Sequence, residues 1–140
     1  MSVLDGAIMR DIPLGTTGQA SLIVRQEHLA SQIKSALLPP VLATPIMILV
    51  MENAALNAIW SFLDSGESAV GTLVDVRHLA ATPVGQQVTA EAIVTEVSDR
   101  RVVFAVTARD EVEEIGRGSH ERAIVDLQRI SRRLSAKSRP

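Results

Sequence analysis

The stretch TPIMILVMENAALNAIWSFLDSG, residues 44–66, decides the fold of this chain. It begins with Thr44 and Pro45, and a threonine N-cap followed by proline in the first turn is typical of a helix start. Gly66 can adopt the left-handed backbone conformation that ends a helix. Apolar side chains occupy nearly all sides of the roughly 20-residue, roughly 30 Å helix between them. Because a helix that is apolar all round is normally buried, we expect the rest of the chain to enclose it.

After Gly66 the hydrophobic pattern changes from a helical period to a period of two. Residues 26–40 suit a short amphipathic helix that Pro39 and Pro40 must end, and the run Gln19–Arg25 is β-like. Strand-like alternation then runs through segments joined by short, turn-rich connections: Val70–Ala80, Gln86–Ser98, Arg101–Arg109 and Ile115–Gln128. Consecutive strands with short links form an antiparallel meander. The sequence therefore predicts an α+β fold in which an antiparallel sheet wraps around one long helix.

Length and composition bound the architecture and the location of the protein. The chain has 140 residues, of which 46% are hydrophobic, so we expect a single folded domain over residues 1–140. It contains no run of 18 uninterrupted apolar residues, so we expect no membrane contact. Asp5 and Asp11, without a basic-then-apolar leader, argue against export. The absence of cysteine excludes disulfides, zinc–thiolate sites and a cysteine nucleophile, and we expect a cytoplasmic protein.

The net charge of −2 is unevenly distributed. Five of the 14 basic residues lie in a tail, residues 129–140, that contains no acidic residue. Residues 1–128 therefore hold nine basic and 16 acidic residues, a net charge of −7. An acidic body with only 2% aromatic residues argues against nucleic acid as a partner. The basic tail is either a solvated end or a contact for an anionic ligand or partner.

Glu52 is the strongest single candidate for a functional residue, because it interrupts the most apolar stretch of the chain. Burying a carboxylate there is costly unless it is paired, hydrogen-bonded or neutral, and such a group suits a general base. The alternative is that Glu52 shares an exposed polar stripe with Asn53 and Asn57. Periodicity leaves both interpretations open.

His78 is the second candidate. Asp75 and Arg77 mark the solvent face of its strand, and His78 shares the opposite face with Val70, Thr72, Val74 and Val76. A lone histidine on an apolar face is more often a satisfied core residue than a catalyst. A carboxylate on the facing helix would change that balance, because the two groups could orient each other.

Thr44 is a weaker candidate, since capping the helix is a sufficient role for it. A hydroxyl at a helix N-terminus also lies where unpaired N–H groups and the helix dipole favour developing negative charge. Eight residues, or about 12 Å of helix, separate Thr44 from Glu52. That distance leaves a partner chain to bring the two side chains together.

Other motifs are absent or structural. The three histidines show no metal-ligand spacing, so we expect no metal site. Neither a glycine-rich phosphate loop nor a serine nucleophile elbow is present. Gly116 and Gly118, in the last strand, predict a bulge or a close approach of another backbone.

Three segments carry a resemblance to a known family. GTLVDVRH (71–78), AATPVG (80–85) and EIGRGSHERA (114–123) resemble the fluoroacetyl-CoA thioesterase family of hot-dog proteins, and Ala43-Thr44 and Met51-Glu52 fit the same pattern. The resemblance covers roughly residues 18–130, the expected core of the domain. The hot-dog fold is a curled antiparallel sheet around one central helix, as the periodicity predicts.

The resemblance implies hydrolysis of a small acyl-CoA thioester by a homodimer, or a tetramer built from dimers, without a metal or a bound cofactor; CoA is part of the substrate. It implies Thr44, Glu52 and His78 as catalytic residues, with Gly71 and Arg122 facing the substrate. Glu52 would activate water or act on the acyl carbonyl, His78 would exchange the proton, and Thr44 would assist. An open sheet edge independently favours dimerisation.

One segment departs from the family. In its fluoroacetyl-specific members, a phenylalanine-rich lid precedes the threonine, whereas residues 28–43 of this chain contain no phenylalanine. Leu37 and Leu38 would line an apolar acyl pocket instead. We therefore expect a small or medium acyl-CoA as substrate.

The alternative to a thioesterase is a hot-dog module that binds acyl-CoA without turnover, as a sensor or scavenger. Hydratase activity is not expected, because the chain lacks the Asp/His pair on a helix that hot-dog hydratases use.

Overall fold

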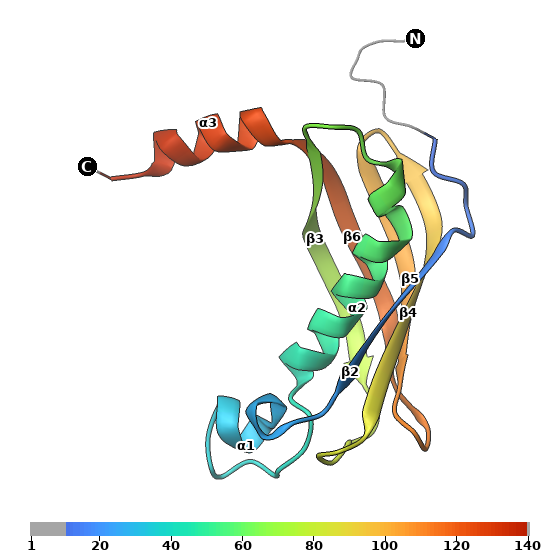
Figure 1. Cartoon of the computed structure of the whole chain (residues 1–140), viewed down its shortest axis with the longest axis vertical. Coiled ribbons are helices and arrows are strands. Elements are labelled where there is room, and N and C mark those ends of the chain that lie inside the picture. The colour runs from blue at the N-terminus through green and yellow to red at the C-terminus, as the bar shows by residue number, and fades with distance from the viewer. Residues whose placement is uncertain (1–10, 140) are drawn as a thin grey trace.

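The computed structural model describes residues 11–139, so Asp5, the other residues before Asp11, and Pro140 lie outside the described part of the predicted domain. A curled five-stranded antiparallel sheet, in the order β2-β4-β5-β6-β3, packs around helix α2 (Thr44–Ile59) (Figure 1). The strands are β2 (Thr17–Ile23), β3 (Glu67–His78), β4 (Gln87–Ser98), β5 (Arg101–Arg109) and β6 (Glu114–Asp126). The predicted α+β architecture is confirmed.

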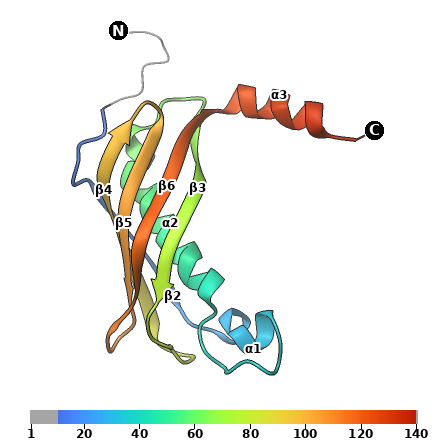
Figure 2. The same cartoon turned by 180° about the vertical axis from the view of Figure 1, so that it is seen from behind.

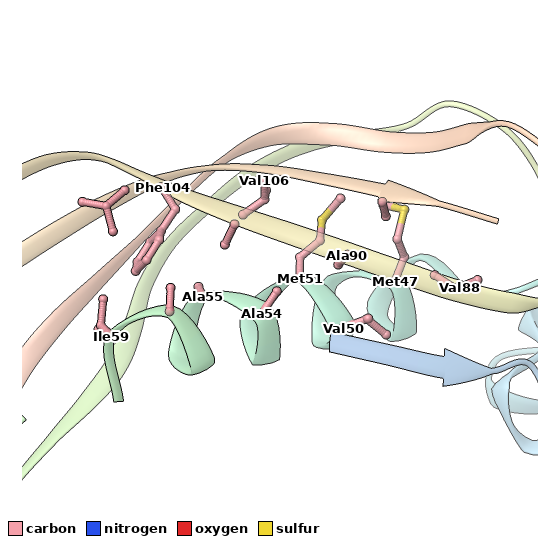
Figure 3. Close-up of a cluster of buried hydrophobic side chains, with 14 of the residues drawn as sticks. Met47, Val50, Met51, Ala54, Ala55, Ile59, Val88, Ala90, Phe104 and Val106 are labelled. Carbon is pink, nitrogen blue, oxygen red and sulfur yellow. The ribbon is translucent and has the colours of Figure 1, made fainter. Parts of the chain in front are cut away.

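The core lies between one side of α2 and the concave face of the sheet. The inward helix residues, among them Met47, Met51, Ala55 and Ile59, contact strand residues such as Phe104 (Figure 3). The other side of α2 exposes Leu49, Asn53 and Asn57, because a single sheet covers only one side of the helix. The prediction that the helix is buried all round was therefore too broad.

By length and composition alone, the stretch Thr44–Phe62 is long and apolar enough to cross a membrane. Here it is the core helix of the fold, continued by the short 3₁₀ turn η2 (Trp60–Phe62). The helix ends at Ile59, seven residues before the predicted stop. Gly66 has the expected positive φ of 84°, but it lies in the turn that leads into β3 and does not cap α2.

Two predicted segments differ from the structure. Residues 26–40 form two short helical turns, η1 (Gln26–His28) and α1 (Ala30–Ile33), in place of one amphipathic helix. The last strand ends at Asp126, and the basic tail forms helix α3 (Leu127–Lys137). The Asp126 carboxylate explains this boundary, because it accepts hydrogen bonds from the N–H groups of Gln128 and Arg129 and so caps α3.

Strand β3 is an edge strand, and a register shift interrupts its pairing with β6 between Gly71 and Leu73. The extra residue reverses which side chains face α2. Ala69 is buried and Gly71 faces the helix before the shift, whereas Val76 and His78 lie on the more buried face after it. The prediction that Val70 and Thr72 share the inward face of His78 was therefore wrong.

Close backbone contacts hold the sheet against the helix. A Cβ atom at Gly18, in β2, would lie 2.3 Å from both the Ala54 oxygen and the Ala58 nitrogen of α2. Gly116 and Gly118 in β6 make the close approaches that the sequence predicts, the first to Met47 and the second to the backbone of β3. A side chain at Gly18 or Gly116 would push the sheet away from α2, and one at Gly118 would clash with β3.

The Gly18 contact gives a direct stability test. We expect Gly18→Ala to lower the free energy of unfolding in urea by about 1–3 kcal/mol, because helix and strand must separate to admit the methyl group. Thr17→Ala, at the exposed neighbouring position, is the control and should change stability by less than about 0.5 kcal/mol. Equal effects of the two substitutions would contradict this packing.

Candidate active site

The first part of the site is a pair formed by Thr44 and His78. The Thr44 hydroxyl lies 2.8 Å from His78 Nδ1, so it joins the start of α2 to the end of β3. Ala43 takes the N-cap position, and Thr44 makes no capping hydrogen bond. The predicted capping role of Thr44 was therefore wrong, because the helix begins one residue earlier and the histidine engages the hydroxyl.

One ring nitrogen of His78, Nδ1, is hydrogen-bonded to Thr44, and the other, Nε2, is buried and has no partner within residues 11–139. Burial lowers the pKa of His78 below its ordinary value of 6.5, and the backbone of Ala80 offsets part of this effect. A neutral imidazole with a free nitrogen can accept a proton at neutral pH.

The pair borders a cavity of about 370 Å³ with a largely apolar wall. Its lining consists of Ala30, Val41, Leu42, Thr44, His78, Leu79, Ala80 and Ala81. Leu37 and Leu38, the predicted pocket residues, do not line it, and Leu37 is 95% exposed. Val41 and Leu42, which follow the two prolines, take the place that was predicted for these leucines.

The second part of the site surrounds Glu52. A Cβ atom at Gly71 would lie only 2.8 Å from Glu52 Oε2, so the carboxylate fits against β3 because residue 71 lacks a side chain. The Glu52 side chain is 34% exposed, which places it between the two predicted extremes of burial and free exposure. It therefore combines a fixed position with access for a ligand.

Arg122 supplies the positive charge beside this carboxylate. Its Nη1 lies 3.9 Å from Glu52 Oε2, and its Nη2 donates a 2.8 Å hydrogen bond to the Ala69 carbonyl. Burial lowers the pKa of Arg122 and the Glu52 charge opposes that shift, yet a guanidinium keeps its proton at neutral pH. The structure therefore places Arg122, which the family resemblance implies as a substrate-facing residue, beside Glu52.

His120 belongs to the same cluster, and the sequence analysis missed it as a site residue. It is 1% exposed, its ring stacks on Phe104, and its Nδ1 lies 2.8 Å from the Leu73 carbonyl oxygen. Because a carbonyl only accepts, Nδ1 carries the proton, and Nε2 accepts a 3.2 Å hydrogen bond from Arg122 Nη1. The spacing of His120 and Arg122, two residues apart on one strand face, was the available signal.

These contacts form a chain from the strand irregularity to the carboxylate. His120 binds the Leu73 carbonyl at the register shift and also orients Arg122, which in turn faces Glu52. Burial lowers the pKa of His120, the Leu73 carbonyl partly opposes this, and the Arg122 charge lowers it further. A neutral His120 is the form that this network requires.

The two parts of the site remain separate within one chain. Among residues 11–139, no hydrogen bond joins Glu52 to His78, and eight helix residues, or about 12 Å, separate Glu52 from Thr44.

The AATP segment, residues 80–83, has a structural role near the cavity. Buried Thr82 donates a 2.8 Å hydrogen bond to Asp110, which also accepts from the N–H groups of Val112 and Glu113. That turn supports the wall that carries Ala80 and Ala81.

Comparison with known proteins identifies the family to which the chain belongs. The model of the fluoroacetyl-CoA-specific thioesterase (FlK) family matches residues 24–128. The chain is 41% identical over 100 residues to the fluoroacetyl-CoA thioesterase of Streptantibioticus cattleyicolor, which covers 71% of this chain and 72% of that protein. The chain belongs to the fluoroacetyl-CoA-specific thioesterase family. It is a thioester hydrolase with the hot-dog fold, and its substrates are acyl-CoA esters.

Solved structures of family members superpose on most of this thioesterase. The fluoroacetyl-CoA thioesterase FlK aligns with a TM-score of 0.87 and 33% identity, covering 92% of this chain and 99% of FlK. A thioesterase superfamily member from Thermus thermophilus aligns with a TM-score of 0.84 and 31% identity, covering 92% and 97%. Variants of FlK have been solved with acetyl-CoA and with fluoroacetate and CoA. Helix α3 begins at the end of the segment that the family model matches.

The buried His120 links the stability of this thioesterase to pH. Because its pKa is lowered in the folded protein, the unfolded chain binds more protons just below pH 6.5. The free energy of unfolding should therefore be at its full value above pH 6.5 and should decrease as the pH falls toward about 5. His120→Asn keeps a donor for Leu73 but does not titrate, so we expect a shallower decrease, with a loss of about 1–3 kcal/mol at neutral pH.

Denaturant unfolding at several pH values measures this slope. Phe104→Leu is the matched control, since it removes packing against His120 without removing a titratable group. It should lower stability equally at every pH. A His120→Asn variant that keeps the whole wild-type slope would show that His120 does not carry this pH dependence.

Proposed function

We propose that this thioesterase hydrolyses a small or medium acyl-CoA to the free acid and CoA, with Glu52 and His78 as the acid–base pair and Thr44 assisting. One observation carries the proposal. The Glu52 carboxylate lies against the bare backbone of Gly71, beside the Arg122 guanidinium, and keeps 34% of its side chain accessible. An aligned, accessible carboxylate in an otherwise apolar helix suits attack on a thioester.

The role of Glu52 follows from what surrounds it. Arg122 neutralises its charge without a short hydrogen bond, since the 3.9 Å separation leaves both carboxylate oxygens able to accept from water. Glu52 can activate a water molecule. Alternatively it can attack the acyl carbonyl, so that the C–S bond breaks, CoA leaves as a thiolate that takes up a proton, and water then hydrolyses the mixed anhydride to the free acid and the Glu52 carboxylate. Both routes require the thioester carbonyl to lie beside the Glu52 carboxylate, which rests against Gly71.

His78 and Thr44 are proposed to act on the leaving group side. His78 borders the 370 Å³ cavity, its buried Nε2 has no partner among residues 11–139, and the Thr44 hydroxyl fixes the ring through Nδ1. The start of α2 at Thr44 also contributes the positive end of a helix dipole, which stabilises developing negative charge. A substrate that spans the gap between Glu52 and His78 would contact both groups.

The acyl group is proposed to be small or medium in size. The cavity beside His78 is apolar, modest in volume and formed by alanine, valine and leucine side chains. The segment that leads to it, residues 28–43, contains no phenylalanine. We therefore do not carry the fluoroacetyl selectivity of the curated relative over to this chain. No cofactor is needed for the proposed chemistry beyond the CoA of the substrate itself.

The active assembly is proposed to be a homodimer, or a tetramer of two such dimers, in the cytoplasm. β3 is an edge strand of 12 residues, and it exposes Val70, Leu73 and Val74. Long apolar edges pair with another chain unless they are covered. Antiparallel pairing of β3 with β3 of a second copy would extend the sheet across both subunits.

Release of the CoA thiol across a panel of acyl-CoA esters tests the proposed function. We expect turnover of one chain-length class. Glu52→Gln and His78→Ala should each lower kcat by about 10²–10⁴-fold, the usual contribution of general acid–base catalysis. Thr44→Val should lower it less, because it removes only the group that fixes the imidazole.

Glu113→Gln is the matched control, since it neutralises an exposed carboxylate in the turn before β6. It should leave kcat unchanged. Tight binding of one ester without turnover by the wild type would favour the non-catalytic binding module. Full turnover by Glu52→Gln would remove Glu52 from the mechanism.

A further inference from the structure

A cleft of about 840 Å³ lies where α3 leaves the sheet, far from the cavity beside His78. Gly66 and Glu67 line it from the start of β3, Ile124 lines it from β6, and Arg129, Ile130 and Arg133 line it from α3. Helix α3 has no buried residue and extends past β3, beyond the edge of the sheet (Figures 1 and 2). The proposed reaction does not use this cleft.

The charges in the cleft favour an anion. The lining holds three acidic side chains, and all are engaged: Glu67 pairs with Arg100, Asp126 caps α3, and Asp64 also has an interaction partner. The guanidinium groups of Arg129 and Arg133 have no ion-pair or hydrogen-bond partner within residues 11–139. They stand four residues apart on one helix face, a spacing at which like charges repel each other. A bound anion would relieve that repulsion.

The apolar part of the cleft narrows the class of ligand. Ile124 and Ile130 lie beside the two guanidinium groups. Arginine binds phosphate through paired hydrogen bonds, and an apolar wall accepts a heterocyclic base. A phosphorylated nucleotide offers both phosphates and a heterocyclic base, and one end of the CoA molecule is such a nucleotide.

Within one chain, this cleft is too far from the reacting groups to serve them. The cleft is at the start of the 12-residue strand β3 and His78 is at its end, so about 36 Å of strand separates them. In an antiparallel pairing of two β3 strands, centred on the strand, the start of one strand lies beside the end of the other. This pairing places Glu67 of one subunit beside His78 of the other, and the cleft of one chain then adjoins the cavity of its partner.

We propose that the phosphates of a CoA ester held at Thr44 and His78 of one subunit bind in the α3 cleft of its partner, on the partner's Arg129 and the partner's Arg133. The inference rests on the proposed function and on the β3 dimer. Each complete site then consists of a cavity from one chain and a cleft from the other. Helix α3 reaches past the sheet edge and buries no residue within its own chain, a position that suits this arrangement.

The binding part of the proposal is tested with R129A/R133A. For CoA esters we expect KM to rise roughly 10- to 100-fold with kcat unchanged, the effect of losing hydrogen bonds to charged groups. The N-acetylcysteamine thioester of the same acid lacks the nucleotide, and its KM should not change. R132A/K137A removes the same charge from α3 outside the cleft and should behave as the wild type. Calorimetric titration with CoA gives the same comparison without turnover.

The trans arrangement is tested with a mixed dimer of His78→Ala and R129A/R133A chains. We expect half the wild-type kcat with the wild-type KM, because the intact His78 is then served by the intact α3 of the other chain. A raised KM would place the arginines in the same chain as the histidine and would overturn the proposal.

Several outcomes separate this inference from the proposals on which it rests. Equal effects of R129A/R133A and R132A/K137A on CoA binding would overturn the inference alone. A monomer by sedimentation would overturn the dimer, and with it the inference. Weaker CoA binding by R129A/R133A, in a protein that hydrolyses no ester, would support the nucleotide site and overturn the proposed function.

Discussion

The β-bulge between Gly71 and Leu73 is the constraint on which the site depends. Gly71 and His78 are seven residues apart, so a regular strand would point them to opposite faces of the sheet. The extra residue turns both toward α2, where Gly71 faces Glu52 and His78 meets Thr44. A bulge usually leaves backbone groups unpaired, and here His120 binds the Leu73 carbonyl at the shift. One strand irregularity therefore turns both halves of the candidate site toward α2.

A buried cation supports this arrangement. Removing Arg122 from water is costly unless its charge and its donors find partners. Glu52, His120 and the Ala69 carbonyl partner the two terminal nitrogens, whereas the buried Nε has no partner within residues 11–139. The same guanidinium lies 3.9 Å from the Glu52 carboxylate, without a short hydrogen bond to it. His120 contributes by remaining neutral, since protonation would turn its acceptor nitrogen into a donor facing Arg122. Stability and reactivity are thus coupled through three side chains.

Much of this could be predicted from the sequence, because periodicity reports burial directly. The long helix, the four-strand meander and the close approaches at Gly116 and Gly118 are all visible in residue spacing. The bulge is not, because apolar residues such as Val70, Leu73 and Val74 stand on both faces of β3, so the sequence does not mark the change of phase. Ala43 as the N-cap and the role of His120 depend on contacts between distant segments. Helix α3 was missed because it buries no residue, so its amphipathic pattern has no core to match.

The central claim is that β3 joins two chains and that each site needs both of them. Sedimentation of the wild type and of Leu73→Lys, with thioesterase activity measured on the same samples, tests it most directly. Leu73 is 48% exposed on the edge strand, and a two-fold pairing would bring the two lysines close together. We expect the wild type at twice the chain mass of 15.0 kDa or a multiple of that, and a monomeric variant with little CoA-ester turnover. Ile93→Lys, on a strand inside the sheet, should stay dimeric and active. A monomeric wild type with full turnover would contradict the claim.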